Sequence, residues 1–388
     1  MNEPIESLPA PLEAALLPAG VRARFVDGVN GLRMHVLEAG HGREGAPMLL
    51  LLHGFPELAY SWRAVMPGLA DAGWHVVAPD QRGYGRTTGW ARGYDADLAP
   101  FRMANLVRDA MGLVAALGRD HVDAVIGHDF GSPVAAWAAL MRPDVFRSVV
   151  LMSAPFGGPP SLPPLGGSRP PGDPGAALAA LAALPRPRKH YQWYYSTREA
   201  DADMLGAPRG LHAFLRAYYH VKSADWPGNR PYRLAGWSAD ELAKLPTYYV
   251  MDLADDMPAA VAPHAPTAAE VAACRWLPEE ALRVYTHEYA RTGFQGGLQW
   301  YRCGTSGRFL AEQQTWAGRR IEVPAMYVAG AADWGVHQKP GDFEAMRTRA
   351  CARMLACELV EGAGHWVQQE RPDEVVRLLR GFLREARG

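Results

Sequence analysis

The chain has 388 residues, of which 48% are hydrophobic and 21% charged, and its net charge is −1. This balance is typical of a globular protein with a large core, and it gives no reason to expect nucleic acid or an anionic membrane as a partner. Small uncharged ligands fit the composition better.

The beginning of the chain and the cysteines favour a cytoplasmic protein. Residues 1–20 contain three Glu and no Lys or Arg, unlike a secretory or transit peptide. No apolar run approaches the length of a membrane span. The cysteines show neither CxxC spacing nor the density of a disulfide scaffold, which favours reduced thiols at Cys274, Cys303, Cys351 and Cys357.

The first 155 residues alternate short apolar runs with helical patterns. Strands are predicted within 48–54, 74–80, 122–129 and 146–155. Residues 103–118 carry apolar side chains at positions i, i+4, i+7, i+8 and i+11, which predicts a helix lying on a sheet. Buried strands joined by crossover helices indicate an α/β fold with a mostly parallel central sheet and helices on both faces.

This alternation stops after Pro155 and resumes with predicted strands in 323–333 and 352–365, followed by a helix that Pro372 opens. The sequence therefore predicts a discontinuous core of residues 1–155 and 319–388. Residues 156–318 would form an inserted, mainly helical cap over the carboxyl ends of the strands. A Pro/Gly-rich loop is expected at 157–175.

The segment "VDAVIGHDFGSPVAAW" at 122–137 predicts a sharp turn from a strand into a helix. Gly127 and Gly131 flank Asp129 at the apex, where close backbones require small residues. The bare pattern is weak evidence, but its position before a helix N-terminus favours an anion at Asp129. Asp129 is therefore the candidate nucleophile.

Two further candidates follow in the order nucleophile, acid, histidine. Asp333 ends "AMYVAGAAD", and His365 lies in "EGAGHW" after three small residues. A strand-terminal Asp is often a turn former or helix cap, and a loop histidine is often only a surface residue. Other acids compete with Asp333 for its role: Asp342, Glu344 and Glu361.

The segment "HGFPE" at 53–57 follows the strand "MLLLL", where it can be a plain turn or one side of an oxyanion hole. In this architecture the hole consists of the backbone N–H after the nucleophile, here Phe130, and one from this loop, here Phe55. Four neighbouring residues are predicted to contact the substrate: His53, Pro56, Trp334 and Trp366.

Together, "HGFPE", "DQRGYGRT", "GHDFG" and "GAGHW" resemble the α/β-hydrolase-fold epoxide hydrolases. Within the cap, "HYQWYY" and "TGFQGGLQWYR" resemble the two segments that carry the oxirane-binding tyrosines of that family, which maps these onto Tyr191 and Tyr301. Composition alone would not single out either tyrosine in so aromatic a cap. Two features depart from the family: Phe130 replaces the more common Trp, and the Pro/Gly-rich loop and residues 222–275 exceed the usual cap.

The resemblance implies hydrolysis of an epoxide to a vicinal diol through an ester on Asp129. Protonated phenols of Tyr191 and Tyr301 would donate to the opening oxygen, and His365 with Asp333 would activate water. No metal or organic cofactor is expected. The expected partners are water and a small, mostly apolar epoxide, with a homodimer as a candidate assembly.

Two alternatives stay open. A haloalkane or haloacid dehalogenase would use the same aspartate and the same ester hydrolysis, although Phe130 lacks the indole N–H that holds a halide. A hydrolase-fold receptor would keep the pocket without turnover, which the presence of all five candidate residues disfavours.

Overall fold

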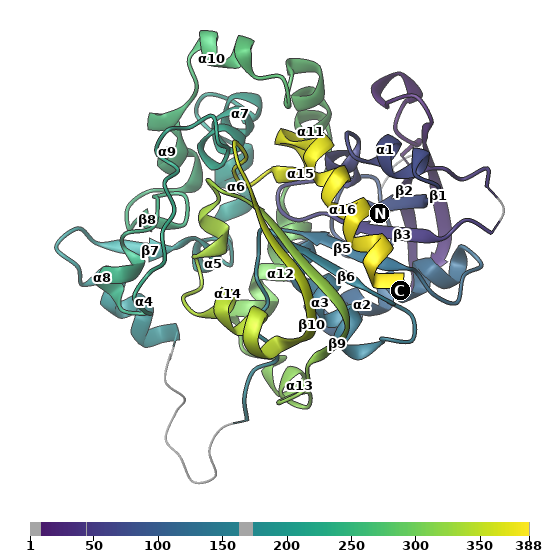
Figure 1. The fold of residues 1–388 in the computed structure, drawn as a ribbon. Helices are drawn as coiled ribbons and strands as arrows, with labels where there is room; N and C mark the ends of the chain where they lie inside the picture. The colour runs from purple at the N-terminus through teal and green to yellow at the C-terminus, as the bar shows by residue number, and fades with distance from the viewer. Residues whose placement is uncertain (1–8, 44, 163–173, 388) are drawn as a thin grey trace, which may run out of the picture.

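The computed structural model describes residues 9–43, 45–162 and 174–387, and it is built around one large twisted sheet (Figure 1). The eight strands follow the order β1-β2-β4-β3-β5-β6-β9-β10. β1, β2 and β4 pair antiparallel, whereas the pairs from β4 through β3 to β10 are parallel. The strands are β1 (Val21–Val29), β2 (Leu32–Ala39), β3 (Met48–Leu52), β4 (His75–Pro79), β5 (Ala124–His128), β6 (Val149–Met152), β9 (Ile321–Gly330) and β10 (Cys351–Val360).

Helices cover both faces of this sheet, as the continuous apolar runs predict. Leu50 and Leu52 of β3 belong to the core cluster that includes residues of α2 and α3. Leu49 and Leu51 point to the opposite face and belong to the cluster that includes residues of α1 and α16. The four helices are α1 (Met66–Asp71), α2 (Met103–Ala116), α3 (Gly131–Met141) and α16 (Pro372–Arg387).

The predicted strands in the first and last parts of the core are all present, and α2 and α16 confirm the two predicted core helices. The hairpin of β1 and β2, which adds the antiparallel edge of the sheet, is not among the elements predicted from the sequence. The core also has shorter helical elements: η1 (Ala14–Leu16), η2 (Ala59–Trp62), η3 (Ala99–Phe101), η5 (Trp334–Val336), α14 (Asp342–Ala345), the π-helical η6 (Met346–Ala350) and α15 (Val367–Glu370).

The chain between β6 and β9 is mainly helical and lies beside the strand ends (Figure 1). Part of the predicted loop at 157–175 lies outside the described residues. The small sheet of β7 (Arg188–His190) and β8 (Val250–Asp252) is antiparallel. The helices are α4 (Pro174–Ala182), α5 (Tyr191–Tyr194), α6 (Ala200–Leu205), α7 (Leu211–Lys222), α8 (Ala239–Leu242), α9 (Met257–Val261), η4 (Ala262–His264), α10 (Ala268–Ala273), α11 (Glu279–Thr292), α12 (Gln295–Thr305) and α13 (Leu310–Gln314).

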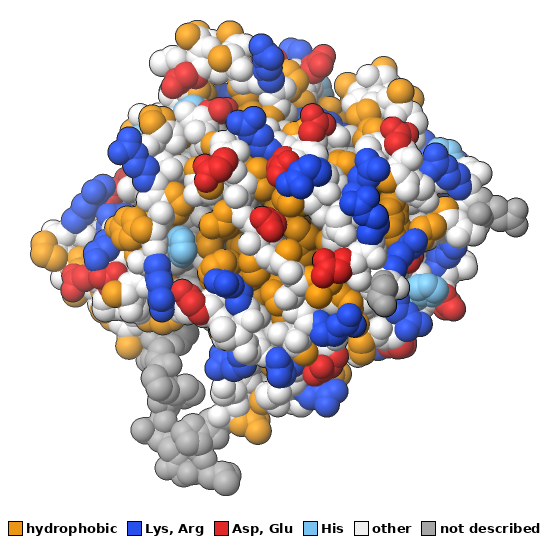
Figure 2. All heavy atoms as spheres, viewed as in Figure 1, with side chains coloured by type: hydrophobic (Ala, Val, Ile, Leu, Met, Phe, Trp, Pro, Cys, Tyr) orange, Lys and Arg blue, Asp and Glu red, His pale blue; other side chains and the backbone are white. Residues whose placement is uncertain are grey.

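On the face that Figure 2 shows, acidic and basic side chains are interspersed around apolar areas. In the part of the chain that the structure describes, no helix combines the length and the apolar character needed to cross a membrane. All four cysteines are free.

Candidate active site

The site begins at the turn between β5 and α3, where Asp129 takes a left-handed backbone conformation with φ of 51°. The backbones at this turn pass so close that the flanking glycines leave no room for a side chain. A Cβ on Gly127 would lie 2.0 Å from the Gly131 carbonyl oxygen, and one on Gly131 would lie 2.2 Å from the Leu52 carbonyl oxygen. The two glycines therefore allow Asp129 to project from the strained apex.

Asp129, His365 and Asp333 form a hydrogen-bonded row at the carboxyl ends of β5, β10 and β9. Nε2 of His365 lies 3.1 Å from Oδ2 of Asp129. Nδ1 of His365 lies 3.1 and 3.2 Å from the two carboxylate oxygens of Asp333. The Gly335 N–H donates to Asp333 at 2.7 Å, which fixes that carboxylate at the start of η5. Two aspartate carboxylates therefore lie on opposite sides of one imidazole. This is the arrangement of a nucleophile–histidine–acid triad.

The loop after β3 supplies a backbone donor to the same aspartate. The Phe55 N–H donates to Oδ1 of Asp129 at 2.9 Å. Gly54 lies directly against that side chain, since a Cβ at this position would be 2.4 Å from Oδ1 of Asp129. One carboxylate oxygen of Asp129 therefore accepts a hydrogen bond from a backbone amide, and the other faces His365.

The electrostatics of the row favour two ionised carboxylates. Burial acts to raise the pKa of Asp129, but the hydrogen bond and charge of His365 and the charge of Lys222 bring the pKa below its ordinary value. Burial likewise opposes ionisation of Asp333, and His365 with the Gly335 N–H lowers the pKa of that carboxyl. Both groups are therefore anionic at neutral pH.

Two cap tyrosines lie on the other side of the site. Tyr191 opens α5, Tyr301 lies in α12, and their ring centroids are 6.0 Å apart. The ring of Tyr301 also contacts Phe55 and Phe130, at 5.5 and 5.1 Å between centroids. Burial and the negative charge of Asp129 raise the pKa of both phenols well above 10, so both hydroxyls stay protonated.

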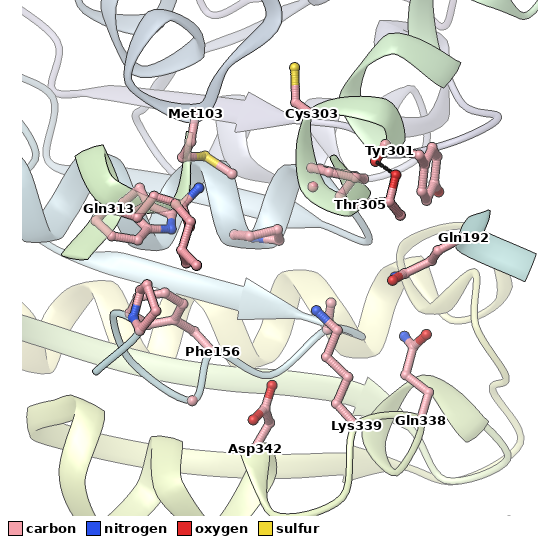
Figure 3. A pocket seen from close by; sticks show the side chains of 18 of the residues that line it. Met103, Phe156, Gln192, Tyr301, Cys303, Thr305, Gln313, Gln338, Lys339 and Asp342 are labelled. Atoms are coloured by element: carbon pink, nitrogen blue, oxygen red, sulfur yellow. Dashed lines mark hydrogen bonds between the residues drawn. The ribbon is translucent and has the colours of Figure 1, made fainter. Parts of the chain in front are cut away.

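A cavity of about 470 Å³ connects Asp129 with both tyrosines. Figure 3 shows side chains from several elements around it, among them Met103, Phe156, Gln192 and Gln338. Phe130 and Trp137 add apolar wall. The size and apolar lining are those of a small-molecule site.

Four residues predicted to contact the substrate are not part of the cavity wall: His53, Pro56, Trp334 and Trp366. The His53 ring is fully buried, and its Nε2 accepts the Gln81 N–H at 3.1 Å. The indole N–H of Trp366 donates to the Tyr219 carbonyl at 2.8 Å, which directs that ring into the cap–core contact. The cavity thus gives no support to direct substrate contact by these four residues.

A buried ion pair that was not predicted from the sequence lies behind the row. Nδ1 of His128 lies 2.6 Å from Oε2 of Glu57, and Nε2 of His128 lies 2.6 Å from the His365 carbonyl oxygen. Burial acts to lower the pKa of His128, but Glu57 raises it overall. Because both ring nitrogens face oxygen acceptors, both must carry protons, and His128 is a cation. The pair thereby holds the backbone of His365.

Lys222, at the end of α7, is a second feature that the sequence analysis missed. Its Nζ lies 5.0 Å from the ring centroid of Tyr249 and 5.3 Å from those of Tyr218 and Trp366. Its carbonyl accepts the His365 N–H at 2.8 Å. This aromatic cage places a buried cation next to the row, where its charge stabilises the Asp129 carboxylate.

Known proteins share both the fold and the length of this chain. Residues 47–197 match the family described as alpha/beta hydrolase fold. The chain is 33% identical to epoxide hydrolase A of Mycobacterium tuberculosis, over 93% of this chain and 96% of the relative. It is 32% identical to epoxide hydrolase B of the same organism, over 91% and 96%.

Solved structures give the same result. The crystal structure of epoxide hydrolase A from Mycobacterium thermoresistibile matches with a TM-score of 0.72 and 34% identity, covering 94% of this chain and 98% of that one. An epoxide hydrolase from an endophytic Streptomyces matches with a TM-score of 0.74 and 32% identity, covering 95% and 97%. Fold and site define the class as α/β-hydrolase-fold proteins. Within that class, the chain belongs to the epoxide hydrolase family.

Proposed function

We propose that this protein hydrolyses an epoxide to a vicinal diol through an ester formed on Asp129. The observation that carries the proposal is the pairing of a buried carboxylate at the turn with two protonated phenols across the same cavity. A carboxylate suits attack at a saturated carbon, because the resulting ester has a carbonyl that water can attack. A serine would give a stable ether instead.

In the first step, Oδ2 of Asp129 attacks one oxirane carbon while Oδ1 stays on the Phe55 amide. The ring C–O bond breaks, its electron pair moves to the oxygen, and that oxygen takes a proton from a cap phenol. A phenol can supply this proton because it is protonated at neutral pH. The product is a hydroxyalkyl ester of Asp129 and a phenolate.

In the second step, His365 removes a proton from water, and the hydroxide attacks the ester carbonyl carbon of Asp129. The Phe55 N–H, with the Phe130 N–H as its proposed partner, stabilises the oxyanion. The ester C–O bond then breaks, and the diol oxygen takes the proton from His365. The proton left on the Asp129 carboxyl restores the phenol, and Asp333 stabilises the transient imidazolium.

The cavity favours a small, mostly apolar epoxide, because Met103, Phe130, Trp137 and Phe156 form much of its wall. A cytoplasmic location and a homodimeric assembly remain predictions from the sequence.

Incubation with an aryl epoxide and, separately, with a haloacid tests the proposal. We expect diol from the epoxide, no halide from the haloacid, and no diol with Asp129→Ala. Halide release would show a dehalogenase, and binding of the epoxide without either product would show a receptor. Retained turnover in a folded Asp129→Ala protein would contradict the proposed nucleophile.

A further inference from the structure

The two cap tyrosines have different hydrogen-bond partners. The Tyr191 hydroxyl donates to Oε1 of Gln338 at 3.1 Å, and its oxygen accepts from Nε2 of Gln192 at 3.2 Å. Among the residues that the structure describes, no side chain forms a hydrogen bond with the Tyr301 hydroxyl. Of these two cavity-lining phenols, Tyr301 is therefore the one whose O–H no described residue engages.

The contact between Tyr191 and Gln338 joins the cap to the loop that also carries Asp333. Tyr191 is 4% exposed and Gln338 is 6% exposed, so both partners of this hydrogen bond are buried. Both glutamines line the cavity (Figure 3). The bond is thus a buried feature of the site, and its loss would leave a buried polar group unpaired.

A phenol has a single proton to donate. While the Tyr191 proton lies on Gln338, Tyr191 can assist ring opening only after that bond is broken. Gln192 donates to the same oxygen from the next position in the chain, which holds the Tyr191 hydroxyl from a second side.

We propose that Gln338, supported by Gln192, makes the two tyrosines unequal: Tyr301 protonates the opening oxygen, and Gln338 holds the Tyr191 hydroxyl away from it. Gln338 is then a positioning residue that acts through Tyr191. This inference rests on the proposed function, in which a cap phenol is the acid of the first step.

The test compares alkylation rates, measured by rapid mixing in a single turnover, for Tyr301→Phe and Tyr191→Phe. We expect Tyr301→Phe to slow alkylation about 100-fold, within the usual range for loss of a general acid, and Tyr191→Phe to slow it less than about 5-fold. Equal losses in the two variants would overturn the inference.

Substitutions at position 338 provide the decisive comparison. Gln338→Met removes the acceptor and frees the Tyr191 proton. Here the cost of Tyr191→Phe means the factor by which it slows alkylation, and this factor should be at least about 5-fold larger in the Gln338→Met background than in the wild type. Gln338→Glu keeps an acceptor for the Tyr191 proton, so Tyr191→Phe should still slow alkylation only slightly in this background. This variant provides a second comparison if the Met variant does not fold. A purely structural role of Gln338 would change stability without changing the cost of Tyr191→Phe.

Gln313 is a matched control, because it lines the same cavity from α13 and, within the described part of the chain, forms no hydrogen bond with either tyrosine hydroxyl. Gln313→Met should leave the cost of Tyr191→Phe unchanged. The same cost of Tyr191→Phe in the wild-type, Gln338→Met and Gln313→Met backgrounds would overturn the inference. Mass spectrometry separates this result from failure of the proposed function: an adduct on Asp129 with equal tyrosine effects overturns only the inference, whereas the absence of any adduct in His365→Gln overturns both.

Discussion

The side chain at position 129 determines which chemistry the turn can perform. Burial acts to raise the pKa of this carboxyl, but the hydrogen bond and charge of His365 and the charge of Lys222 lower it overall. The carboxylate is therefore already ionised, and no base has to remove a proton from it before it attacks. The proposed mechanism therefore leaves His365 free for the second step, the attack of water on the ester.

The division of labour predicts that His365→Gln still forms the ester but hydrolyses it slowly. We expect ester hydrolysis to slow by about 100-fold or more, because the general base is lost while the nucleophile and the phenols remain. Intact-protein mass spectrometry after mixing with a reactive epoxide should show one added substrate mass. The double variant Asp129→Asn/His365→Gln is the control and should show none. Rapid turnover without an adduct in His365→Gln would contradict this division.

At this scale the sequence predicted the residues that lie in motifs, and the structure brings Asp129, Asp333 and His365 into one row. The sequence did not predict the contacts of Glu57 with His128 or of Tyr191 with Gln338. These partners are 71 and 147 residues apart, and only the folded chain brings them together. Glu57 and His128 stand inside recognised motifs, but a motif does not state which of its members pair with one another.

At the level of the elements, β3, β5 and α3 pack so closely that the turn between β5 and α3 needs two glycines. A Cβ on Gly131 would meet the carbonyl oxygens of Leu52 and His53 at 2.2 and 2.6 Å, and both belong to backbone that cannot move alone. The elements that present Asp129 are therefore packed so closely that this turn has no room for an additional methyl group.

Gly131→Ala should destabilise the protein by about 3 kcal/mol, as expected for overpacking against backbone. The control is Gly381→Ala in α16, where a Cβ would meet nothing within 4 Å. It should stabilise the protein by up to about 1 kcal/mol, because alanine is the better helix former. Urea unfolding measures both changes. Equal midpoints for wild type and Gly131→Ala would contradict the close packing.

The elements of the parallel sheet were predictable because buried strands are continuous apolar runs. The hairpin of β1 and β2 escaped because β1 is half-exposed and mixes polar with apolar residues. A turn signal was nonetheless present: Asn30 and Gly31 both have positive φ, 49° and 82°, as a two-residue hairpin turn of this kind requires. Apart from α7, α11 and α12, the cap helices that the structure describes are short, and the order of the cap helices in space depends on contacts that no local pattern encodes.

Over the whole molecule, buried polar contacts fasten the cap to the core around the site. Tyr219 donates to the Pro56 carbonyl at 2.9 Å, and Trp300 donates to the Arg82 carbonyl at 3.0 Å. Glu370 of α15 adds a third connection. It accepts the N–H of Ala224 in the cap at 2.8 Å and the N–H groups of Gly364 and Trp366, on either side of His365, at 3.0 Å each.

This connection should make stability depend on pH in a defined direction. Burial raises the pKa of Glu370 from 4.5 to about 7, against three backbone donors that lower it. A carboxyl with a raised pKa contributes stability that is fully present below the unfolded pKa, near 4.5, and that is lost as the pH rises through about 7. The shift corresponds to about 3 kcal/mol.

Thermal unfolding of wild type and Glu370→Gln between pH 4.5 and 8.5 tests this expectation. The wild type should lose stability relative to Glu370→Gln as the pH rises, because glutamine does not titrate. Acids with lowered pKa values, such as Asp129 and Asp333, are shared by both proteins, so their effect cancels in the difference. A difference that stays constant across this range would contradict the raised pKa.

The central claim is that Asp129 forms a covalent ester, and a single turnover in oxygen-18 water tests it most directly. With enzyme in excess over epoxide, the mechanism predicts unlabelled diol and label in a peptide that contains Asp129, because water attacks the carbonyl carbon of the enzyme. Repeated turnovers should then yield labelled diol. Labelled diol in the first turnover, with no label in the Asp129 peptide, would show that water attacks the epoxide itself and would contradict the covalent mechanism.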